Sequence, residues 1–180
     1  WLAFLDSDDY WLPTKLAAQV NFHQQHQDIF ISQTNEVWLR NGKRLNQKKY
    51  HQKLAGNIFK PSLARCLISP SAVLLHKKVL ATVGLFDETL PACEDYDLWL
   101  RVTLHYWVGL VPPALVVKNG GHSDQLSQQV WALDRYRVKA LLKLLKSNSL
   151  NASQRQAVVM TLVRKLLILK NGAAKRCLAL

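Results

Sequence analysis

The chain has 180 residues, of which 49% are hydrophobic, and this composition fits one folded domain and excludes an intrinsically disordered chain. Its formal net charge of +12 makes nucleic acid or an anionic membrane surface a partner to consider. The basic residues lack the motif spacing of a nucleic-acid-binding module, so no nucleic-acid partner is predicted. Three widely spaced cysteines fit a reducing cytoplasm better than a disulfide framework.

The chain opens with an apolar run, 1–5, that ends in three carboxylates. Such a run is typical of a strand buried on both faces. Open α/β sheets bind ligands at the carboxyl ends of their strands, so Asp6, Asp8 and Asp9 predict a site for a divalent cation and a phosphate. One of them could instead cap the helix that begins near Pro13. Because such a strand needs neighbours and the chain begins without Met, we expect the C-terminal part of a longer enzyme.

The next elements alternate between helix and strand. A helix is predicted over 13–26, with Leu16, Ala17, Val20 and His23 on the face that covers the sheet. Further elements are expected in this order: strands at 28–32 and 35–39, the hairpin turn Asn41-Gly42, a strand at 43–45, a polar loop over the active face at 46–56 and a helix at 58–67.

The second half of the sequence is predicted to contain more helix than strand. We expect a strand at 68–75, a helix at 76–83 closed by Gly84, a helix at 94–105, strands at 107–110 and 114–118 separated by two prolines, and helices at 126–146 and 153–170. The last helix has a mixed apolar and basic face that includes Val158 and Lys165. This face fits either packing on the domain or docking on a membrane.

A second acidic group lies in the first turn of the helix at 94–105. Glu94, Asp95 and Asp97 repel one another there, although the helix dipole offsets part of the repulsion. A structural helix start rarely needs three carboxylates, and an ionised one can act as a general base. Trp99 lies one turn after Asp95 and could stack on a sugar or belong to the core. Arg101 is expected to pair with an acid.

His122 follows two glycines in a polar turn, and these glycines would let the backbone fold over a ligand. A simply solvated loop histidine is the alternative interpretation.

Two sequence blocks resemble family 2 glycosyltransferases with the GT-A fold. WLAFLDSDDYWLPTK at 1–15 is similar to the DxD segment of that family. GLFDE at 84–88, followed by EDYDLWLR at 94–101, resembles its second signature, and the order of the blocks also matches. The resemblance implies an α/β fold: a partial GT-A domain (a Rossmann-like nucleotide-diphospho-sugar transferase domain) at 1–127, with a helical extension at 128–180. It also implies that the N-terminal nucleotide-binding half is missing, so we expect the chain alone to be nearly inactive.

The resemblance further implies a metal-dependent transfer, with inversion, of a sugar from a nucleotide-diphosphate sugar donor to an acceptor hydroxyl. The cofactor would be a divalent cation, Mg²⁺ or Mn²⁺. The acceptor would be a saccharide or lipid-linked, in bacterial-type polysaccharide biosynthesis, in the cytoplasm and in peripheral contact with the inner face of the membrane. The implied roles are metal binding by Asp6 and Asp8, donor binding by Asp6, Asp9 and His122, base catalysis by Asp95, and acceptor contact by Glu94, Asp97 and Trp99.

Two other functions are compatible with parts of the sequence. Haloacid-dehalogenase-like phosphotransferases share an Asp-x-Asp motif whose first Asp, here Asp6, is a nucleophile, but they favour Thr or Val soon after the second Asp. Here Asp9 and Tyr10 follow it. The basic tail at 155–176 could instead belong to a non-catalytic module that docks on membranes or nucleic acid.

Overall fold

The computed structural model describes residues 1–46, 49–121 and 130–175. The strands are β1 (Tyr10–Trp11), β2 (Ile31–Arg40), β3 (Lys43–Leu45), β4 (Val73–Leu75) and β5 (Gly109–Gly120). The α-helices are α1 (Lys15–Gln25), α2 (Phe59–Ala64), α3 (Lys77–Val83), α4 (Glu94–His105), α6 (Asp134–Lys146) and α7 (Ala152–Lys175). Two single-turn 3₁₀ helices are η1 (Lys49–His51) and η2 (Pro70–Ala72).

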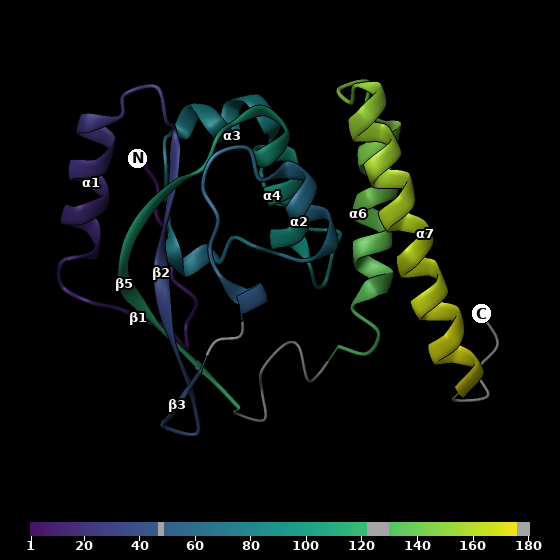
Figure 1. Cartoon of the computed structure of the whole chain (residues 1–180), viewed down its shortest axis with the longest axis horizontal. Coiled ribbons are helices and arrows are strands. Elements are labelled where there is room, and N and C mark those ends of the chain that lie inside the picture. The colour runs from purple at the N-terminus through teal and green to yellow at the C-terminus, as the bar shows by residue number, and fades with distance from the viewer. Residues whose placement is uncertain (47–48, 122–129, 176–180) are drawn as a thin grey trace.

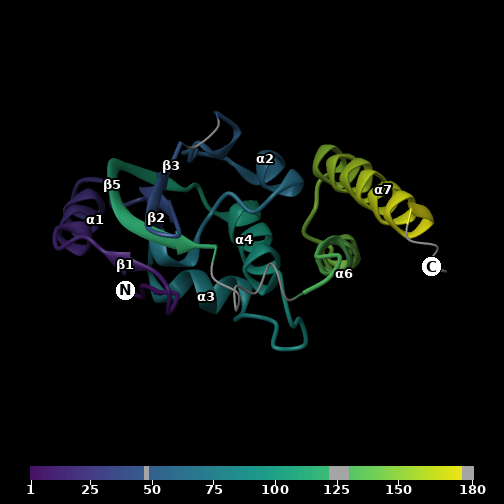
Figure 2. The same cartoon turned by 90° about the horizontal axis from the view of Figure 1, so that it is seen from below.

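The strands form one mixed sheet in the order β1-β5-β2-β3, and β4 also pairs with β2. Its two long strands, β2 and β5, are parallel, and the other pairings are antiparallel. Helix α1 covers one side of the sheet, while α3 and α4 lie on the other (Figures 1 and 2). Helices α6 and α7 form a hairpin beyond α2 and α4, on the side away from the sheet (Figure 1). The predicted α/β class is therefore confirmed.

Strand β5 corrects the prediction of two short strands. It runs through both prolines, and its pairing with β2 passes from Val111 directly to Ala114. Pro112 and Pro113 fall in the resulting bulge, where their missing N–H groups remove no ladder bond. The side chain of Asn35 donates a hydrogen bond to the Pro112 carbonyl and holds the bulge against β2. The strands predicted at 28–32 and 35–39 likewise form one strand, β2.

The apolar run 1–5 is not the predicted buried strand. Within the described residues its backbone pairs only at Leu2, which makes an isolated bridge with Leu75. Trp1 and Leu5 are 52% and 49% exposed. A strand requires a ladder of successive backbone bonds, and one bridge does not supply it.

Several local predictions are confirmed. Helix α4 has the predicted bounds, and Gly84 closes α3 with a φ of 82°. Asn41 and Gly42 both have positive φ and join β2 to β3, as a type I′ hairpin turn requires.

Helix α1 forms where predicted, but of the residues expected to cover the sheet only His23 is buried. Its buried residues are Lys15, Gln19 and His23, whereas Leu16 and Val20 are 42% and 45% exposed. The reason is that the backbone beneath α1 presents oxygen atoms that need donors. The Gln19 side-chain amide donates to the carbonyl oxygens of two buried segments, β2 and η2.

Lys15 gives this buried polar face a pH dependence. Its ammonium donates a hydrogen bond to the Val73 carbonyl at 3.2 Å, and burial lowers its pKa to about 8. Between pH 8 and the usual lysine pKa of 10.5, the unfolded chain holds a proton that the folded protein has lost. The free energy of unfolding therefore increases as the pH rises through that window, because the buried amine becomes neutral.

Between pH 8 and pH 10.5, we expect the free energy of unfolding of the wild type to rise by about 3 kcal/mol more than that of Lys15→Met. Urea unfolding of both proteins across this range measures the difference. Lys77→Met is the matched control because Lys77 is an exposed helical lysine. A difference between the wild type and Lys15→Met that stays flat with pH would contradict the prediction.

Two clusters of buried side chains organise the interior. One includes Ile31 of β2 and Leu98 of α4, between the sheet and the helices. The other joins α2, α4, α6 and α7, with Phe59 and Leu141 among its members. The α6–α7 hairpin is thus packed on the α/β unit, and the predicted boundary at 127/128 lies outside the described residues. No helix in the described part of the chain has the length and apolar character needed to cross a bilayer.

Candidate active site

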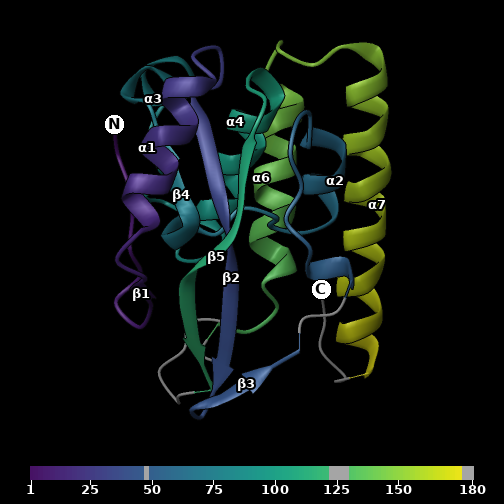
Figure 3. The ribbon, with the colours of Figure 1, turned by 60° about the vertical axis from the view of Figure 1, so that its left-hand side comes forward.

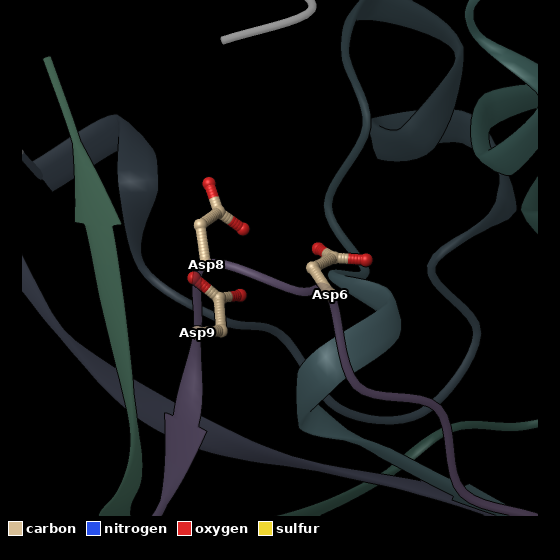
Figure 4. A group of neighbouring side chains, drawn as sticks. All are labelled: Asp6, Asp8 and Asp9. Carbon is tan, nitrogen blue, oxygen red and sulfur yellow. The ribbon is translucent and has the colours of Figure 1, made fainter. Parts of the chain in front are cut away.

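The three carboxylates predicted to bind a metal lie together on the turn that precedes β1 (Figure 4). Asp6, Asp8 and Asp9 each offer one oxygen atom, and these atoms lie within 4.8 Å of one another. The donor set is hard and anionic, which is the chemistry that Mg²⁺ and Mn²⁺ favour. The residues therefore fit a divalent cation.

Asp9 differs from the other two because its side chain is fully buried. Its Oδ2 atom accepts a hydrogen bond from Ser71 Oγ at 2.7 Å and lies 2.9 Å from Lys118 Nζ. Its Oδ1 atom accepts from the backbone N–H of Asn119 at 3.3 Å. Asp9 thus fastens the acidic turn to η2 and to β5, and Asp6 and Asp8 are the members that line the neighbouring cleft.

Lys118 places a positive charge inside this acidic group. Its Nζ atom lies 3.3 Å from Asp6 Oδ2 as well as contacting Asp9. Burial alone lowers the pKa of Lys118, but the hydrogen bond to Asp9 and the surrounding carboxylates outweigh it and raise the pKa. Lys118 therefore remains charged and offsets the repulsion among the carboxylates.

A cleft of about 570 Å³ opens beside the acidic turn. Among its lining residues are Asp6 and Asp8 from the turn, and Glu94 and Asp95 from the start of α4. Two acidic groups far apart in the sequence thus share one cleft. This juxtaposition is the geometry that the two sequence blocks predicted.

Asp95 is held by neighbours on both of its oxygen atoms. Oδ1 accepts the backbone N–H of Tyr96 at 2.6 Å, and Oδ2 lies 3.3 Å from the Sγ atom of Cys66, which donates to it. Burial, followed by the charge of Asp95, raises the pKa of the Cys66 thiol well above its usual value, so the thiol stays a donor. Burial also raises the pKa of Glu94.

The cleft also contains charged residues that the sequence analysis did not identify. Glu36 of β2 pairs with Lys53 at 2.9 Å, and Arg137 of α6 lies on the wall that the hairpin contributes. Burial tends to raise the pKa of Glu36, but the charge of Lys53 and a hydrogen bond from Trp38 bring it below the usual value. The polar stretch at 46–56 was predicted to lie over the active face, and Lys53 is its member in the cleft. A glutamate inside a predicted strand was the available signal for Glu36.

Two predicted acceptor-side residues lie elsewhere and require correction. Trp99 is 1% exposed in the core, which is the alternative that the sequence left open. Asp97 is 3% exposed and pairs with Arg101 at 2.7 Å and with Lys143 at 3.0 Å. Neither Asp97 nor Trp99 belongs to the lining of the cleft, because α4 turns these positions toward the interior. His122 lies outside the described residues.

The fold and the cleft together define a class of protein. The mixed sheet with its parallel central pair, and the cleft lined by an acidic turn and a second acidic group, fit a GT-A-like fold. The chain matches the model of the family described as Glycosyltransferase like family 2 over residues 1–126. It belongs to this family.

Relatives and structural neighbours agree with this assignment. An uncharacterized glycosyltransferase of Rickettsia bellii is 31% identical over 140 residues, which cover 73% of this chain and 20% of that protein. The UDP-Glc:alpha-D-GlcNAc-diphosphoundecaprenol beta-1,3-glucosyltransferase WfaP of Escherichia coli is 30% identical over 114 residues, or 57% of this chain and 38% of WfaP.

A crystal structure of S. aureus TarS in complex with UDP-GlcNAc superposes with a TM-score of 0.64 at 17% sequence identity. The match covers 89% of this chain and 47% of the TarS chain, and it shows a shared fold. The chain thus spans less than half the length of each of these three proteins.

Proposed function

We propose that the cleft binds a nucleotide-diphosphate sugar and a divalent cation, and that the protein transfers the sugar to an acceptor hydroxyl with inversion. The observation that carries this proposal is the meeting of the DxD turn and the acidic start of α4 in one cleft. Support comes from the family match, from the UDP-GlcNAc in the TarS structure and from the UDP-Glc in the name of WfaP.

Asp8 and Asp6 are the proposed metal ligands because both line the cleft. A bound Mg²⁺ or Mn²⁺ would supply Lewis-acid stabilisation of the departing diphosphate. Asp9 would act on the donor side only indirectly, since its oxygens already contact Ser71, Lys118 and Asn119. Lys53 and Arg137 line the same cleft and would attract the diphosphate charge. His122 remains proposed as a further donor contact.

Asp95 is the proposed general base for the acceptor hydroxyl. Its oxygen atoms are oriented by Tyr96 and Cys66, and the side chain is partly exposed to the cleft. Inversion requires the hydroxyl to attack the anomeric carbon on the face opposite the leaving diphosphate, while Asp95 accepts the hydroxyl proton. Glu94, beside it in the cleft, is the remaining acceptor-side candidate.

The acceptor is proposed to be a saccharide or a lipid-linked sugar. WfaP acts, by its name, on a sugar joined to diphosphoundecaprenol. A lipid-linked acceptor would place the protein on the inner face of the cytoplasmic membrane.

Mn²⁺ binding to the purified chain tests the metal site without requiring turnover. We expect Asp8→Asn to weaken Mn²⁺ affinity by at least about tenfold in calorimetric titration, and to weaken Mn²⁺-dependent binding of UDP-sugars in parallel. Asp28→Asn is the matched control because Asp28 is exposed and lies outside the cleft lining. Unchanged Mn²⁺ affinity in Asp8→Asn, or an equal loss in Asp28→Asn, would overturn the assignment.

A further inference from the structure

Helix α7 presents an apolar stripe to solvent. Its buried residues, which include Val158, Leu162 and Lys165, face α6 and α2. On the opposite face, a second set of apolar side chains follows the three- and four-residue spacing of a helix. This stripe consists of Val159 (43% exposed), Met160 (51%), Val163 (49%), Leu166 (47%) and Leu167 (52%).

No described residue covers this stripe, because of where α7 lies in the fold. Views along two perpendicular directions show α7 at the outer edge of the molecule, with α6 and α2 on its inner side (Figures 2 and 3). Monomeric proteins rarely expose a continuous apolar patch without using it. The stripe is therefore a candidate interface, and its surroundings indicate which partner it fits.

The charges around the stripe are almost all positive. Residues 134–175 contain ten lysines and arginines and a single acid, Asp134, which is paired inside the hairpin with Lys165 at 3.0 Å. Helix α7 itself contains no Asp or Glu. Exposed cations lie within one turn of the stripe at Arg155, Arg164 and Lys170.

This combination selects among possible partners. A second copy of the chain would oppose two positively charged faces, which disfavours self-association. Nucleic acid would use the cations but not the row of Val, Met and Leu between them. The interface of an anionic bilayer takes both, because apolar side chains enter the acyl boundary while Lys and Arg meet the headgroups.

We propose that the exposed stripe of α7 docks the protein onto anionic lipid, with the helix lying in the plane of the membrane surface. The helix would lie on the bilayer and not span it, since no described helix meets the requirement for a span. The hairpin also contributes Arg137 to the cleft wall. Docking would therefore hold the hairpin, and with it one wall of the cleft, near the membrane, where a lipid-linked acceptor is located. This last consequence rests on the proposed function; the docking itself does not.

Vesicle flotation tests the docking directly. The protein is mixed with vesicles of phosphatidylglycerol and phosphatidylcholine in equal parts, or of phosphatidylcholine alone. We expect binding to the anionic vesicles to exceed binding to the neutral ones by about tenfold or more, and to fall when NaCl is raised from about 0.05 M to about 0.5 M. The double variant Leu166→Glu/Leu167→Glu should lose at least about tenfold in binding to anionic vesicles.

Leu16→Glu/Val20→Glu is the matched control, since it places the same two charges at exposed apolar positions on α1, at the opposite side of the molecule. Circular dichroism and thermal unfolding verify that both variants fold, and the stripe side chains are exposed enough for this to be expected. The proposal fails if Leu166→Glu/Leu167→Glu binds vesicles as well as Leu16→Glu/Val20→Glu does. It also fails if light scattering shows a dimer that only Leu166→Glu/Leu167→Glu disrupts. A third contrary outcome is that this variant loses binding to an oligonucleotide and keeps its binding to vesicles. Flotation needs no donor or turnover, so its failure leaves the proposed function standing.

Discussion

Asp95→Asn should lower the rate of sugar transfer by about 10²–10⁴-fold while leaving metal-dependent donor binding unchanged. The amide cannot accept the proton of the attacking hydroxyl, and this proton is the contribution that Asp95 is proposed to make. Donor binding should survive because the substituted group belongs to α4, whereas the proposed metal ligands belong to the turn before β1. The measurement is turnover and donor affinity in whichever form of the protein transfers sugar, the chain alone or a longer polypeptide that contains it.

Glu88→Gln is the control for this variant. Glu88 lies in the same signature region, is exposed and is not part of the cleft lining. Removing its charge should leave the rate within about twofold of the wild type. Normal turnover by Asp95→Asn would refute the base assignment, and an equal loss in Glu88→Gln would show that the effect is not specific to the cleft.

The part of the candidate site that could be predicted from the sequence consists of two short acidic motifs. Asp6, Asp8, Glu94 and Asp95 were singled out because carboxylates clustered in one turn repel one another, and such a cluster suits a cation or a proton acceptor. Their meeting in one cleft was implied by the family resemblance, and the structure places all four in the lining of one cleft. Lys118 could not be identified in this way. A lysine near the end of a strand looks like any solvated lysine until the fold brings a buried carboxylate beside it.

The fold shows the same division between local and long-range information. The bounds of α4 and the turn at Asn41-Gly42 depend on neighbouring residues, and both were predicted correctly. The buried face of α1 depends instead on carbonyl and hydroxyl groups of β2, β4 and η2, which no helical periodicity encodes. The prolines of β5 were interpreted as a strand break because sequence cannot show that β2 tolerates a bulge opposite them.

Lys118→Met should destabilise the protein by about 3–5 kcal/mol, the cost of leaving a buried charge without its partner. The Asp9 side chain is fully buried, and Lys118 Nζ is the cation at 2.9 Å from its Oδ2 atom. Ser71 and Asn119 would still donate to the carboxylate, but neither carries a charge. Urea unfolding measures the loss. Lys139→Met, at an exposed position of α6, should change the free energy of unfolding by no more than about 0.5 kcal/mol.

A double-mutant cycle identifies the origin of this loss. If the unpaired Asp9 charge is responsible, adding Asp9→Asn to Lys118→Met should recover part of the lost stability, because the amide no longer needs a cation. If Lys118 acted only by packing its aliphatic stem, the second substitution would add its own cost and the double variant would be the least stable of the set. Because Asp9 pairs with Lys118 in the structure, the double-mutant cycle should give a coupling free energy of at least about 1 kcal/mol between these two residues.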